Sequence, residues 1–114
     1  DAYMQRGRMQ YLRRNYEGSI ESFEDCIAYG SEAIECWYLR GLAHFFLNNC
    51  DQAWDILQQA RTRAQQQGSL ESIIENIEVG LYNITELCIG FSDRALPTSI
   101  PPTEIPPTPI GGFN

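Results

Sequence analysis

The sequence contains no lysine, a single histidine, and no proline before Pro97. All eight basic residues are arginines, and 15 acidic residues give the chain a net charge of −7. Such an acidic chain is poorly suited to nucleic acid as its main partner. The lone histidine and four cysteines without a CxxC pair also fail to supply a recognisable zinc-ligand set. We therefore expect no nucleic-acid partner, no metal and no cofactor.

The motifs of common enzymes are also missing. The chain has no phosphate-binding loop and no nucleophile motif. Its only histidine, His44, lies in an apolar stretch, where a packed side chain is commoner than a catalytic base. No apolar run is long enough to span a membrane, and no leader sequence is visible. The chain starts at Asp1 within a helical pattern, as a fragment of a longer protein would. These features predict a non-enzymatic protein without a membrane span.

The surroundings of the cysteines in the sequence indicate the redox state of the compartment. Cys26, Cys36 and Cys88 fall among apolar positions, where a free thiol serves as a small hydrophobic side chain. We therefore expect a reducing compartment such as the cytoplasm. Asn83-Ile84-Thr85 matches a glycosylation sequon, but it falls inside a predicted helix, and we interpret the match as chance.

The most apolar stretch, Trp37–Leu47, is hydrophobic nearly all round when wound as a helix. Such a helix must be buried on several sides, so the rest of the chain has to supply its neighbours. The spacing of apolar residues predicts five helices, at about 2–12, 16–29, 33–47, 51–67 and 70–89. Asp51 and Ser69 are the expected N-caps of the last two, and Gly30, Gly68 and Gly90 the expected stops.

The sequence also repeats itself at a shift of 34 residues. Glycine and small residues recur where two helices of a hairpin must approach closely, and aromatic residues recur where the space between successive hairpins must be filled. The matched pairs are Tyr3 and Trp37, Gly7 and Gly41, Tyr11 and Phe45, Ser19 and Ala53, and Cys26 and Ala60.

This pattern resembles the tetratricopeptide repeat (TPR) family over about residues 1–67. The leucine that usually precedes the glycine is replaced by Arg6 and Arg40, and the closing proline by Ser31 and Gln65. The resemblance implies an all-α fold, a fragment of a right-handed solenoid of stacked helical hairpins. It divides the chain into repeats at 1–33 and 34–68, an end helix at 69–90 and a proline-rich extended tail at 91–114.

The resemblance also implies a protein-binding groove lined by the first helix of each hairpin. The matching residues are Met4, Arg8, Tyr11, Leu12, Tyr38, Leu39, Leu42, Phe45 and Phe46. Family members that grip acidic C-terminal peptides use Lys, Asn and Arg in this groove. Here Met4, Arg8 and Leu39 stand at three of those positions, which argues against that ligand class.

Two functional interpretations stay open. The chain is expected to be a scaffold or adaptor that binds a helical or extended apolar segment of a partner, or else a permanent structural subunit of a larger complex. An apolar groove is seldom left uncovered. For the groove itself a structural interpretation therefore also stays open, in which helix 70–89, or further repeats, fills it as ordinary core.

The tail holds all six prolines, which favour extended polyproline II. Its isoleucines, Ile100, Ile105 and Ile110, recur every five residues. They predict a segment ordered by contact with the repeats or with a partner protein, in place of a plain linker.

Overall fold

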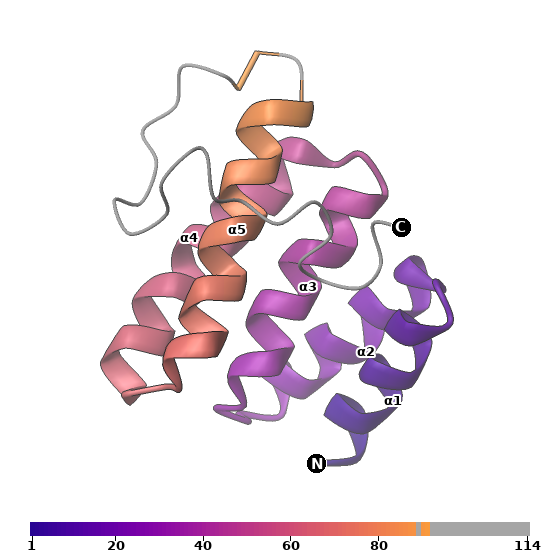
Figure 1. The fold of residues 1–114 in the computed structure, drawn as a ribbon. Coiled ribbons are helices and arrows are strands. Elements are labelled where there is room, and N and C mark those ends of the chain that lie inside the picture. The colour runs from indigo at the N-terminus through magenta and orange to yellow at the C-terminus, as the bar shows by residue number, and fades with distance from the viewer. Residues whose placement is uncertain (89, 92–114) are drawn as a thin grey trace.

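The computed structural model describes residues 1–88, 90 and 91. Within this part the chain forms helices and no strand, which confirms the all-α prediction (Figure 1). The five helices are α1 (Ala2–Leu12), α2 (Tyr16–Ala28), α3 (Ile34–Phe46), α4 (Cys50–Gln67) and α5 (Glu71–Leu87). The predictions about the proline-rich tail, Ile100, Ile105 and Ile110 among them, lie outside the described residues.

Helix α3 is the central element of the molecule. It packs against α4 and α2 most extensively and also touches α1 and α5. α1 and α2 form one antiparallel pair on one side of it, and α4 and α5 lie on the other side (Figure 1). The central place of α3 follows from its sequence, because a helix without a continuous polar face gains stability only when it is covered on several sides.

The two glycines of the repeat stand where helices nearly touch. A Cβ atom added to Gly41 would lie 2.8 Å from Leu57 Cγ, and one added to Gly7 would lie 2.5 Å from Phe23 Cε1. Phe23 and Leu57 are themselves 34 positions apart. Both hairpins therefore use the same close approach between the same repeat positions, as the sequence predicts.

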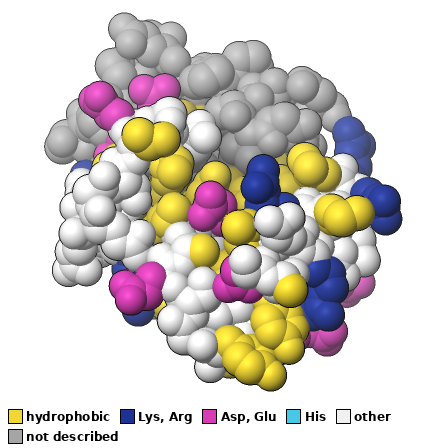
Figure 2. Space-filling model, turned by 90° about the horizontal axis from the view of Figure 1, so that it is seen from below, with side chains coloured by type: hydrophobic (Ala, Val, Ile, Leu, Met, Phe, Trp, Pro, Cys, Tyr) yellow, Lys and Arg dark blue, Asp and Glu magenta, His cyan; other side chains and the backbone are white. Residues whose placement is uncertain are grey.

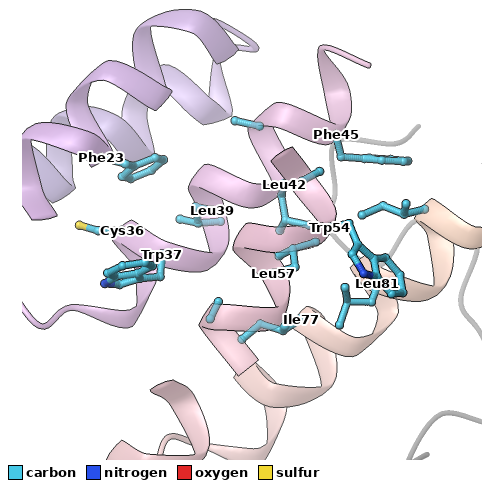
Figure 3. Packing of buried hydrophobic residues seen from close by; sticks show 14 of the residues in the cluster. Phe23, Cys36, Trp37, Leu39, Leu42, Phe45, Trp54, Leu57, Ile77 and Leu81 are labelled. Atoms are coloured by element: carbon cyan, nitrogen blue, oxygen red, sulfur yellow. The ribbon is translucent and has the colours of Figure 1, made fainter. Parts of the chain in front are cut away.

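Buried hydrophobic side chains from α3, α4 and α5 meet in the core (Figure 3). Leu42 of α3, Leu57 of α4 and Leu81 of α5 are all fully buried there. Gly80 permits this packing, since a Cβ atom at that position would lie 2.8 Å from Leu42 Cδ2. α5 is thus an integral part of the core and not a polar cover.

A cation–π contact also joins α4 to α3, between Arg63 and Trp37. The guanidinium carbon of Arg63 lies 3.9 Å from the centre of the Trp37 ring, and that of Arg40 lies 5.2 Å from it. Cation–π contacts of this kind contribute about 0.5–1 kcal/mol at exposed sites. Trp37 is therefore held by electrostatic attraction as well as by burial.

Two predicted helix starts are wrong by one or two residues. α4 begins at Cys50 with Asn49 as N-cap, because Ala53 N donates to Asn49 O at 2.9 Å. Ser69 does not cap α5. Its backbone N–H donates to Ala64 O at 2.9 Å and so closes α4, and Leu70 precedes α5 instead. Gly68 ends α4 in the left-handed region at φ +67°, as the sequence predicts.

The prediction of free thiols is wrong. Cys26 is bonded to Cys36, which ties α2 to α3, and Cys50 is bonded to Cys88, which ties the start of α4 to the residue after α5. The predicted apolar surroundings are present, since Cys26 and Cys36 are both fully buried. What the sequence could not show is that the fold brings these residues into bonding distance. Disulfides persist in oxidising environments, so the pairing favours such a compartment over a reducing one.

The glycosylation sequon lies inside α5, where a glycan could not be attached to the folded protein. Asn83 is 8% exposed and Thr85 4%. The Thr85 hydroxyl donates to Tyr82 O at 2.6 Å. No helix in the described part of the chain is long and apolar enough to cross a membrane.

Candidate partner-binding surface

Aromatic side chains from three helices meet at the ends of α1 and α3. Tyr11 of α1 contacts Phe46 of α3 edge to face, with ring centres 6.1 Å apart. Tyr16, the first residue of α2, stacks on Phe46 at 4.7 Å and meets Tyr11 at 5.6 Å. Phe45 contacts Phe46 at 5.8 Å. We call these four residues, Tyr11, Tyr16, Phe45 and Phe46, the aromatic cluster.

Part of the predicted groove is core. Leu42 is fully buried against Gly80 of α5, and Leu39 and Phe45 are only 8% and 9% exposed. α5 thus contacts at least one of the side chains that the TPR resemblance assigns to ligand binding, Leu42. Covering by the end helix, one of the readings that the sequence left open, is supported at this residue.

The remaining predicted residues form an open edge beside the aromatic cluster. Leu12 is 76% exposed and Arg8 is also exposed, while Met4 and Tyr38 are half-buried. Arg8 is close enough to Tyr38 to lower the pKa of its phenol. We call Met4, Arg8, Leu12 and Tyr38 the open edge. It joins α1 to α3 across one face of the molecule.

Tyr11 and Tyr38 stay neutral near physiological pH. Burial raises the pKa of Tyr11, and the neighbouring phenols of Tyr16 and Tyr38 raise it further. Burial and then Glu35 raise the pKa of Tyr38, against the opposing effect of Arg8. Neither phenol can act as a base at neutral pH. The surface offers apolar contact area and one exposed cation, which suit binding.

His44 lies in the last turn of α3, outside the aromatic cluster and open edge. Its Nδ1 atom is 3.2 Å from the side-chain nitrogen of Asn49, the N-cap of α4. Burial lowers the pKa of His44, and Arg40 lowers it further, while Glu24 raises it. The contact joins two helices. In the part of the chain that the structure describes, no three His, Cys, Asp or Glu side chains are grouped to hold a metal ion.

Tyr16 is the residue of this surface that the sequence analysis missed. It belongs to α2, whereas the TPR resemblance directs attention to α1 and α3. The available signal was the repeat itself, because the position 34 residues later holds Cys50 in place of an aromatic residue. An aromatic side chain that appears in only one of two repeats indicates a local role.

No protein-family model, curated protein or solved structure matches this chain. The resemblance to the TPR family therefore stays a prediction that depends on the repeat residues named above, and functional arguments rest on the surface itself.

Proposed function

We propose that the chain is a non-enzymatic protein–protein interaction module. It binds a helical or extended apolar segment of a partner protein on the open edge, with the aromatic cluster as a rigid support. The TPR resemblance adds weight, because it assigns binding to the same faces of α1 and α3.

The observation that carries this proposal is the exposure of Leu12, which directly follows Tyr11 of the aromatic cluster in the sequence. At 76%, Leu12 is as exposed as any large hydrophobic residue of the described chain. A solitary exposed leucine needs no explanation. Leu12, however, follows Tyr11, whose ring is packed against Tyr16 and Phe46. Binding hot spots combine such fixed aromatic supports with apolar side chains that become buried in the complex.

The experiment is selection of peptide binders from a displayed library of apolar helical and extended sequences, using the 114-residue chain as bait. Selected peptides should bind the unchanged chain and lose at least about tenfold in affinity against Leu12→Asp. Leu87→Asp is the matched control, since Leu87 is 65% exposed at the far end of α5. Thermal melting confirms that both variants are folded.

Binders that tolerate Leu12→Asp as well as Leu87→Asp would show that the open edge is not the binding surface. Failure of the library to yield any binder would favour the other interpretation, a permanent subunit whose contacts form only during assembly. Size-exclusion chromatography of the isolated chain separates these two cases further, because a recruitment module is a folded protein on its own.

We place this module in an oxidising compartment rather than the cytoplasm. The support is the pairing of all four cysteines in two disulfides. Mass spectrometry of the natural protein, alkylated without reductant, tests this placement. If all four cysteines carry the alkyl group, they are free thiols, and the prediction of a reducing compartment is supported instead.

A further inference from the structure

The outer face of α1 carries an exposed stripe of alternating charge and apolar surface. Arg6, Met9 and Arg13 follow one another at i, i+3 and i+7, so they share one side of the helix. Met9 is 52% exposed, and the two arginines are exposed as well. This α1 stripe points away from the open edge described above. Figure 2 shows arginines gathered on the α1 side of the molecule.

The internal repeat shows what kind of surface this stripe fits. The residues of α3 that correspond to Arg6 and Met9 are Arg40 and Ala43. Ala43 is fully buried, and Arg40 Nη1 lies 3.6 Å from Glu24 Oε2 of α2. In the second hairpin, therefore, a glutamate of the amphipathic helix α2 pairs with the arginine of this stripe. In the first hairpin Arg6 donates to Ser22 and Asp25 of α2, and its guanidinium carbon lies 5.2 Å from the centre of the Tyr3 ring, while Met9 stays exposed.

An exposed helix face with the complementary pattern exists at the other end of the molecule. Glu71, Ile74 and Glu75 lie at i, i+3 and i+4 on α5, with both glutamates exposed and Ile74 half-buried. They border a hollow of about 310 Å³ between α5 and α4. We call these three residues the α5 stripe. α1 and α5 stand on opposite sides of α3, so the two stripes cannot meet within one molecule (Figure 1).

We propose that two copies of this chain associate head to tail, with the α1 stripe of one copy on the α5 stripe of the next. Met9 then packs against Ile74, and the arginines face Glu71 and Glu75. Because the two surfaces differ, the association is heterologous and leaves one stripe free at each end. It therefore continues into longer assemblies as concentration rises. The proposal is independent of the partner-binding function, which uses another face.

Sedimentation velocity of the 114-residue chain over a range of concentrations tests the proposal. The average mass should rise past that of a dimer as concentration increases and should fall with added salt, which screens the charge pairs. Arg13→Glu and Glu75→Arg should each weaken association by about threefold to tenfold, because each change replaces an attraction by a repulsion. A chain that carries both changes should recover much of the lost affinity, because the ion pair is restored with its charges exchanged.

Glu21→Arg is the matched control. It changes the net charge as Glu75→Arg does, at an exposed position on α2, and it should leave the assembly unchanged. A chain that stays monomeric at every concentration overturns the proposal, as does a mass that stops at two copies, which would indicate a symmetric dimer. Single variants that associate like the unchanged chain also overturn it. Circular dichroism verifies the fold of every variant.

Discussion

Helices α1 and α3 occupy the same place in their hairpins and yet have opposite surroundings. Arg8 of α1 is exposed, whereas Leu42, its equivalent in α3, is fully buried. Met9 is half exposed, whereas Ala43 is fully buried. Each hairpin nevertheless closes on the same contact, with a glycine against Phe23 or Leu57. The repeat thus determines how a hairpin closes, and neighbouring elements determine which of its outer faces are covered.

The largest expected difference between the helices is the loss of stability on truncating Leu42 compared with truncating Arg8. Leu42→Ala should lower the free energy of unfolding by about 2–5 kcal/mol, because it removes a buried side chain and leaves a cavity among α3, α4 and α5. Arg8→Ala should change it by less than about 0.5 kcal/mol, since exposed side chains contribute little. Urea unfolding followed by circular dichroism measures both. Equal effects would show that α5 does not cover α3.

The two disulfides provide the next test. Cys50–Cys88 closes a sequence separation of 38 residues and should contribute about 2–4 kcal/mol by restricting the unfolded chain. The Cys50→Ala/Cys88→Ala variant should therefore melt well below the unchanged protein. Mild dithiol treatment should open this bond before Cys26–Cys36, because Cys50 is half-buried whereas Cys26 and Cys36 are fully buried. Alkylation and mass spectrometry give the order, and simultaneous opening would contradict the burial difference.

Much of this fold can be predicted from the sequence, for physical reasons that differ between regions. Helix positions follow from local apolar spacing, and the glycine contacts follow from the repeat, since both are visible as regular patterns of residue types. The contact between Leu42 and Gly80 and the pairing of the cysteines leave no such pattern in the sequence. They depend on long-range packing, which no local pattern reveals. For the same reason the sequence does not show which of the predicted groove residues are buried, as Leu42 is, and which are exposed, as Leu12 is.

Tyr11 and Phe45 offer a subtler comparison, because they are equivalent positions that differ mainly by one hydroxyl. The Tyr11 hydroxyl is buried and has no hydrogen-bond partner among the described residues. A buried donor left without a partner costs about 1–3 kcal/mol. Tyr11→Phe should therefore raise the free energy of unfolding by about 1 kcal/mol. Urea unfolding at neutral pH measures it, and a clear loss of stability would mean that the hydroxyl does have a partner.

The smallest expected effect concerns His44, whose equivalent in the first hairpin is the non-titrating Gln10. Burial lowers the pKa of His44, and the nearby Arg40 lowers it further. The unfolded chain therefore binds this proton more readily than the folded one, and the folded state loses stability as pH falls below the ordinary histidine pKa of about 6.5. Above that pH the group is neutral in both states and contributes no pH dependence. His44→Gln copies the first hairpin and retains an amide that can reach Asn49, so it should remove this slope while leaving stability at pH 8 nearly unchanged. Melting temperatures of both proteins between pH 5 and pH 8 provide the measurement. If the two profiles run parallel throughout this range, the slope comes from the carboxylates and not from His44.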